Sequence, residues 1–152
     1  KKIDEMDENF LNKVVQLNFN STFLATQQVL PYMTSGSSIV NFASQAGRDG
    51  GGPGASAYAA SKGAVITFTR SMAKELGQQG IRVNSLCPGM IATTFHDTFT
   101  KDEVRSNVAN ATPLKREGRP DEMATTVSFL LSDESSFLTG VNLDTNGGLV
   151  FS

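Results

Sequence analysis

Apolar residues, with one serine among them, recur at helical spacing near the start of the chain. They are separated by four, three, four and three positions: Phe10, Val14, Leu17, Ser21 and Leu24. This spacing places them on one helix face. With Asp7 as a suitable N-cap, the pattern predicts a helix over about 8–33.

The same periodicity predicts three further helices. One covers about 57–78, is stopped by Gly77 and Gly80, and has one apolar face made of Val65, Phe68, Met72 and Leu76. A short polar helix is predicted in 100–110. The last, over 118–132, has Pro120 at its first position and buries Met123, Val127 and Leu130.

Three short apolar runs predict buried strands. They are "IVNFA" (39–43), "IRVNSL" (81–86) and a strand within "GVNLDTNGG" (140–148), while the glycine-rich segment 44–56 predicts a loop. Alternating helices and strands indicate an α/β fold with a parallel sheet and right-handed crossovers. Three parallel strands alone would leave a bare hydrophobic sheet edge. The chain is therefore interpreted as part of a larger fold.

Composition narrows the classes of function. The 152 residues are 39% hydrophobic and 18% charged, with a net charge of −2, so nothing favours nucleic acid or an anionic membrane as a partner. No apolar run approaches the roughly 18–20 residues of a membrane helix. Cys87 is the only cysteine, which favours a reducing cytoplasm. Cys87 and the only histidine, His96, make no zinc site, so no metal is predicted.

Tyr58 and Lys62 bring a phenol and an ammonium together, one helical turn apart. A nearby positive charge favours the phenolate, and a phenol tuned in this way can give and take a proton. Small residues around the pair were expected to leave room for a planar ligand: Ala59, Ala60, Ser61 and Gly63. The alternative is a half-buried tyrosine beside a solvated lysine.

Two predicted strands end close to this pair. Ser44 follows the strand at 39–43, and "PGMIATT" follows the strand at 81–86. Ligands of open α/β sheets bind beyond the carboxyl ends of the strands. The two strand ends and the first turn of the helix are therefore expected to converge on one site.

These segments together resemble the classical members of the short-chain dehydrogenase/reductase family. The resemblance covers nearly the whole chain, in the family's order: "LNFNSTF" (17–23), "IVNFAS" (39–44), "YAASK" (58–62), "IRVNSLCPGMIAT" (81–93), "GRPDEMA" (118–124) and "FLTG…NGG" (137–148). It implies a Rossmann-type, doubly wound parallel sheet, of which 1–152 would hold the last three strands and their helices. The chain would then be the C-terminal catalytic part of a single domain.

The resemblance implies a role for each matching residue. Tyr58 would be the general acid/base, Ser44 would hold the reacting oxygen, and Asn18 would anchor a water in a proton relay. Lys62 would stabilise the Tyr58 phenolate and hold the nicotinamide ribose. The nicotinamide itself would be cradled by Pro88, Gly89, Ile91 and Thr93, although Gly89 also has an alternative as a simple turn glycine.

Some features depart from the family pattern. The stretch from Ser44 to Tyr58 is one residue longer than the commonest spacing, and Asn146 stands where an acid is usual. No segment supplies the glycine-rich dinucleotide turn, and "GRDGGGPG" (47–54) is interpreted as a substrate-side loop. The choice between NAD and NADP therefore stays open.

The expected activity is NAD(P)-dependent interconversion of a small-molecule carbonyl and alcohol. The nearest types are 3-oxoacyl-carrier-protein reductases and sugar or uronate dehydrogenases, and the polar segment "TTFHDTFTKDEVR" (93–105) is expected to be a lid. The resemblance also implies a homodimer or homotetramer. Two alternatives remain, a non-catalytic scaffold of the same fold and a truncated fragment that is inactive alone.

Overall fold

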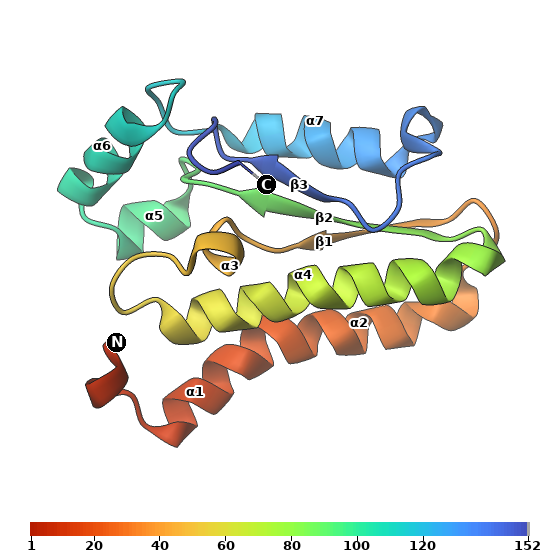
Figure 1. Cartoon of the computed structure of the whole chain (residues 1–152), viewed down its shortest axis with the longest axis horizontal. Helices are drawn as coiled ribbons and strands as arrows, with labels where there is room; N and C mark the ends of the chain where they lie inside the picture. Colours follow the sequence, from red (N-terminus) through yellow and green to blue (C-terminus); the bar gives the residue numbers. More distant parts are fainter. Residues whose placement is uncertain (152) are drawn as a thin grey trace.

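The computed structural model folds the chain into three layers around a parallel sheet (Figure 1). It describes residues 1–151, and for Phe95 and Phe99 it describes the backbone only. The strands are β1 (Ser38–Phe42), β2 (Arg82–Pro88) and β3 (Asn142–Thr145). They are hydrogen-bonded in the order β1-β2-β3, and both pairs are parallel. The predicted α/β fold with a parallel sheet is confirmed.

Helices cover both faces of the sheet. One face carries α1 (Glu8–Val15), α2 (Ser21–Val29) and α4 (Ser56–Leu76), and the other carries α7 (Pro120–Leu131). Three shorter helices gather at the carboxyl ends of the strands (Figure 1): α3 (Ala46–Asp49), α5 (Thr94–Phe99) and α6 (Asp102–Ala111). Short 3-10 turns complete the fold: Ile3–Glu5, Leu30–Tyr32, Gly77–Gln79 and Asp133–Ser135.

The core lies mainly between α4 and the sheet. Two clusters of buried side chains fill this layer: Ala43, Val65, Ile66 and Cys87 in one, and Ala73, Leu76, Ile81 and Val83 in the other. On the opposite face, the fully buried Leu130 of α7 packs over the sheet. This core holds α4 at a fixed height above β1 and β2, and so positions whatever α4 carries at its first turns.

The first predicted helix contains a π turn, Gln16–Asn20, between α1 and α2. A π turn takes in one more residue than an α turn, so the buried face shifts around the helix axis. Leu17 and Leu24, which the sequence pattern placed on the buried face, are instead 66% and 53% exposed. Phe19 and Thr26 turn toward α4 and the core in their place. The predicted helix exists, but its predicted buried face is wrong beyond the π turn.

Two short helices were not predicted. The segment 44–56, expected to be a loop throughout, contains α3, and the turn expected after β2 leads into α5. Such helices are too short to show a hydrophobic period in the sequence, and isolated helices of this length are unstable. Their helical form depends on the neighbours that they pack against. In residues 1–151, no helix combines the length and the apolar character needed to span a membrane.

Candidate active site

The carboxyl ends of β1 and β2 are tied together beside the start of α4. Ser44 lies two residues beyond β1, and Pro88 is the last residue of β2. The backbone N–H of Gln45 donates to the Pro88 carbonyl at 3.0 Å, which joins the two strand ends directly. The Ser44 hydroxyl accepts from the Ala46 N–H at 3.2 Å and stays partly exposed. Ser44 and the loop after β2 therefore belong to one surface.

Tyr58 and Lys62 stand on successive turns of α4. The Lys62 ammonium lies 5.9 Å from the centroid of the Tyr58 ring, and the tyrosine is 38% exposed. Lys62 Nζ also donates to the Phe42 carbonyl at 2.8 Å, at the last residue of β1. Partial burial lowers the pKa of Lys62, because removal from water disfavours the charged form. A partly desolvated ammonium is thus held next to an accessible phenol.

The small residues of this stretch make room for protein rather than for a ligand. Ala59 and Ser61 are buried, and the Ser61 hydroxyl donates to the Tyr58 carbonyl at 2.7 Å. Gly63 faces the backbone of Gly47 in α3. The expectation that these positions clear space for a planar ligand is therefore wrong for three of the four, and only Ala60 is exposed. The space is used to bring α3 against α4.

Gly47 is the point of closest approach between α3 and α4. A Cβ placed on Gly47 would lie 2.8 Å from the backbone of both Lys62 and Gly63. We expect Gly47→Ala to destabilise the protein by about 1–3 kcal/mol, as overpacking does. It should also lower turnover, because it would move Ser44 together with α3 (44–49, the Ser44 segment). Gly52→Ala is the matched control, since a Cβ there meets nothing within 4 Å. Thermal unfolding of the two variants checks this, and equal stability would contradict it.

Asn18 lies in the π turn, on the side that packs against α4. Its neighbour Phe19 contacts Phe68 of α4 edge-to-face, with 5.9 Å between ring centroids. The Asn18 side-chain amide donates to the Val14 carbonyl at 2.9 Å, so it folds back onto its own helix. Any link from Asn18 to Lys62 would therefore run through another group. π turns inside α-helices are frequent at functional sites.

The loop after β2 is held from two sides. The Gly89 N–H donates to the Thr145 carbonyl at 3.2 Å, and a Cβ on Gly89 would lie 2.8 Å from the Cβ of Asn146. Gly89 therefore permits a close approach to β3 and is more than a turn glycine. Further on, Ile91 pairs with Gly118 in an isolated bridge. The loop is rigidly placed along the strand edge.

The segment expected to be a lid, 93–105, forms α5 and the first turn of α6, and Arg105 joins it to the segment before α7. Its guanidinium makes two bonds of 2.7 Å to Glu117 and one of 2.6 Å to Asp97. The hydrogen bond from Arg105 holds the pKa of Glu117 below its usual value. Burial and the Arg105 charge lower the pKa of His96, whose Nδ1 lies 2.8 Å from the Thr100 hydroxyl.

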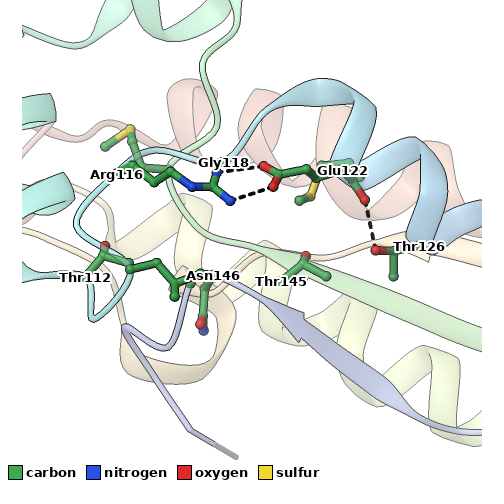
Figure 2. A pocket seen from close by; sticks show the side chains of 11 residues that line it. Thr112, Arg116, Gly118, Glu122, Thr126, Thr145 and Asn146 are labelled. Carbon is green, nitrogen blue, oxygen red and sulfur yellow. Dashed lines mark hydrogen bonds and ion pairs between the residues drawn. The ribbon is translucent and has the colours of Figure 1, made fainter.

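A cavity of about 190 Å³ lies next to the loop after β2, between α7 and the end of β3 (Figure 2). Arg116 and Glu122 form an ion pair along it, with a shortest distance of 2.6 Å, and hydrogen bonding to Arg116 lowers the pKa of Glu122 to about 2. None of the predicted site residues lines this cavity. Its lining consists of Met90, Thr112, Leu114, Arg116, Gly118, Glu122, Met123, Thr126, Thr145, Asn146 and Gly147. The cavity is separate from the Tyr58 site.

In chemical terms, the site offers a phenol, an adjacent ammonium and a nearby hydroxyl. These groups suit proton exchange with an oxygen atom of a substrate. The described part of the chain has no group of three or more His, Cys, Asp or Glu side chains placed to hold a metal. Sequence reasoning missed the packing of α3 on α4 and the ion pair that α3 makes with β3. The glycines of the "AGR" and "SKGA" segments were the available signal for the first of these.

Known proteins are similar in sequence to this chain over most of its length. A family model described as Enoyl-(Acyl carrier protein) reductase matches residues 1–150. The 3-oxoacyl-[acyl-carrier-protein] reductase FabG of Thermotoga maritima is 42% identical over 147 residues, covering 95% of this chain and 59% of the relative. The (3R)-3-hydroxyacyl-CoA dehydrogenase of Rattus norvegicus is 37% identical over 147 residues, which are 95% of this chain and 56% of that protein. The chain thus spans less than two thirds of the length of these relatives.

Solved structures agree over the whole chain. A short-chain dehydrogenase/reductase from Brucella melitensis, described as glucose/ribitol dehydrogenase, has a TM-score of 0.93 and 34% identity over 100% of this chain and 61% of its own. A 4-hydroxyisoleucine dehydrogenase mutant, complexed with NADH and succinate, has a TM-score of 0.90 and 31% identity over 99% of this chain and 63% of its own. Together with the matched family model and the shared sheet, these similarities identify the chain as a member of the short-chain dehydrogenase/reductase family.

Proposed function

We propose that this chain is the C-terminal catalytic part of a single-domain NAD(P)-dependent oxidoreductase that interconverts a carbonyl and an alcohol. The observation that carries the proposal is the arrangement of Tyr58 and Lys62, with the Lys62 ammonium 5.9 Å from the phenol ring and bonded to the end of β1. Ser44 lies on the loop that follows that strand. The site therefore stands where open α/β sheets bind their ligands.

The protein's part of the reaction is proton transfer at the substrate oxygen. In the reducing direction, the Tyr58 hydroxyl gives its proton to the carbonyl oxygen, and the Ser44 hydroxyl donates a hydrogen bond to the same atom. Lys62 stabilises the phenolate that remains. Asn18 would hold a water that returns the proton from solvent. In the oxidising direction each proton moves the opposite way.

The residues present fit the nicotinamide end of the cofactor. The ammonium of Lys62 is suited to bind ribose hydroxyls, and the chain around Pro88, Gly89, Ile91 and Thr93 offers backbone groups and one hydroxyl for the carboxamide. When bound, the nicotinamide supplies or accepts the hydride. The close approach of Gly89 to Asn146 supports a cradle that is fixed before the cofactor arrives. Nothing in these residues separates NAD from NADP.

The substrate class follows from the relatives only in outline. One relative is named as a 3-oxoacyl-[acyl-carrier-protein] reductase and another as a (3R)-3-hydroxyacyl-CoA dehydrogenase, while a structural neighbour is described as a glucose/ribitol dehydrogenase. All three names concern a carbonyl or hydroxyl carbon of a small molecule or a thioester. A non-catalytic scaffold is less well supported, because it has no need of a desolvated lysine beside a phenol.

Assembly into a homodimer or homotetramer is part of the proposal, and so is a cytoplasmic location. Exposed apolar side chains of α2 and the preceding π turn support self-association: Leu17, Phe23, Leu24 and Val29. A closed symmetric arrangement is the usual outcome for such surfaces.

Isotope transfer tests the proposed function directly. The complete protein that carries this chain is incubated with NADH or NADPH deuterated at nicotinamide C4, and with a 3-oxoacyl thioester or a keto sugar. We expect deuterium on the newly formed carbinol carbon, with or without a metal chelator. Loss of activity with chelator and its recovery with zinc would contradict the metal-free mechanism. Absence of transfer to either class of substrate would contradict the proposed reaction.

A further inference from the structure

An ion pair joins α3 to β3 at the edge of the candidate site. Arg48 Nε lies 2.7 Å from Asp144 Oδ1, and both side chains are only 14% exposed. The contact is an ion pair without hydrogen-bond alignment between these two atoms. The other end of the guanidinium donates to the backbone carbonyl of Asn142. Arg48 therefore binds β3 through both a charge and a directed hydrogen bond.

The pair lies on the sheet face that α4 covers. Asp144 stands opposite Cys87 in the parallel β2–β3 ladder, and Cys87 belongs to the core cluster beneath α4. Burial raises the pKa of the Cys87 thiol, while the Arg48 charge acts in the opposite direction. The thiol is therefore a neutral neighbour, and the charge of Arg48 is matched by Asp144.

Arg48 follows Ser44 by one helical turn, and α3 begins only two residues after that serine. A helix of four residues is not stable by itself, so its position is set by its attachments. Gly47 attaches it to α4 by close backbone contact, and Arg48 attaches it to β3. The Ser44 segment is thus held by α4 and β3, in addition to the hydrogen bond from the Gln45 N–H to the Pro88 carbonyl of β2.

The same end of β3 also holds the loop after β2. Thr145, next to Asp144, accepts the Gly89 N–H through its carbonyl at 3.2 Å, and Asn146 packs against Gly89. The loop after β2, which is proposed to cradle the nicotinamide, is called the nicotinamide loop (88–93). The Ser44 segment and the nicotinamide loop therefore contact the same three consecutive residues, 144–146. Strand β3 itself does not need Arg48, because the β2–β3 ladder and the Ser85–Asn142 hydrogen bond already hold it.

We propose that Arg48, through Asp144, is a positioning residue that sets the place of Ser44 relative to the nicotinamide loop. This proposal rests on the proposed function, since it assigns Arg48 a task in the same reaction. Arg48 touches neither substrate nor cofactor. It acts by keeping α3 in register with β3, so that the Ser44 hydroxyl meets the substrate oxygen that Tyr58 protonates.

Backbone hydrogen exchange in the complete protein tests the structural half without any substrate. In Arg48→Met, exchange should rise roughly tenfold in residues 44–51 and stay unchanged in the middle of α4, because only the local attachment is lost. Asp144→Asn should give the same local pattern, and Arg48→Lys an intermediate one. Arg119→Met is the matched control, since it removes an exposed arginine whose ion pairs, with Asp121 at 3.1 Å and Glu122 at 3.6 Å, are with residues close to it in the sequence. Unchanged exchange in 44–51, or an equal rise throughout the chain, would overturn the proposal.

Kinetics test the functional half. Arg48→Met should lower kcat about tenfold while the dissociation constant of the cofactor changes less than about twofold. In a Ser44→Ala background the same substitution should cost less than about twofold, because the residue it positions has gone. Full additivity of the two losses, or a loss confined to cofactor affinity, would overturn the positioning role. Tyr58→Phe runs in parallel: near-normal activity there would refute Tyr58 as the proton donor, whatever Arg48 does, while failure of the deuterium-transfer experiment would refute the proposed function itself.

Discussion

Replacing Tyr58 with phenylalanine should lower turnover of the complete protein at least about 100-fold, the contribution expected of a general acid/base. The substitution keeps the aromatic ring beside Lys62 and removes only the hydroxyl. Tyr58 is 38% exposed, and no intramolecular hydrogen bond of its hydroxyl appears in the described part of the chain, so its loss should cost little stability. Cofactor affinity and thermal stability should therefore be almost unchanged, and steady-state kinetics with a cofactor titration measures the difference.

The chain contains a natural control for this experiment. Its only other tyrosine, Tyr32, is 87% exposed in the 3-10 turn after α2. Tyr32→Phe removes the same hydroxyl from a position outside the site and should leave kcat and KM unchanged. If Tyr58→Phe retained near-normal turnover, Tyr58 would not be the proton donor and the site would need another acid.

Replacing Lys62 with methionine should damage both turnover and cofactor binding. Methionine keeps an unbranched apolar stem but loses the ammonium, which is proposed both to stabilise the phenolate and to hold the ribose. We expect kcat to fall about 100-fold and cofactor affinity about tenfold, so that, unlike Tyr58→Phe, the substitution moves both constants. Lys74→Met, an exposed position farther along α4, is the matched control. A loss in only one of the two constants would contradict the dual role.

Although Lys62→Met should damage turnover and cofactor binding, it should not lower the stability of the protein near neutral pH. Burial holds the pKa of Lys62 below its ordinary value of 10.5, so the folded protein releases this proton at a lower pH than the unfolded chain. Between the two pKa values the unfolded state binds more protons, and the free energy of unfolding rises with pH through that window. Lys62→Met lacks this rise. Near neutral pH the melting temperature of Lys62→Met should equal or exceed that of the unsubstituted protein. As the pH rises, the free energy of unfolding measured with denaturant should increase for the unsubstituted protein relative to Lys62→Met.

Proteins often lose some stability at sites that serve their function. The proposed role of Lys62 would be such a case, because the burial that costs stability also goes with the position of the ammonium next to the Tyr58 ring. The Phe42 carbonyl, at 2.8 Å, is the group that offsets part of that cost.

Much of the fold was predictable because its signals are local. The apolar period of α4, with Val65 and Leu76 buried, and Pro120 at the start of α7 were each visible in a few neighbouring residues. The strands were likewise short apolar runs, and only their ends shifted, as with β2, which continues to Pro88. A helical turn also lies within one stretch of sequence, so the proximity of Tyr58 and Lys62 could be predicted from their spacing alone.

The features that were predicted wrongly depend on contacts between distant segments. The π turn at Gln16–Asn20 changes which side of α2 is buried, and the small residues near Tyr58 accommodate α3 through Gly47 and Gly63. No periodicity within one segment reports on the neighbour that will pack against it. A small residue allows close backbone approach only where a second segment packs against it. That second segment cannot be identified from the neighbours of the small residue in the sequence.

The parallel α/β fold, the order of its strands and longer helices, and the pair of groups proposed to exchange a proton could be predicted, because they follow from residue types a few positions apart. How the proposed site is held depends on contacts that form only when the chain folds. Arg48 meets Asn142, 94 positions along the chain, and Lys62 meets Phe42, 20 positions back. Such partners are brought together by the parallel crossovers of the sheet, and no local sequence pattern links Arg48 to the strand that it contacts.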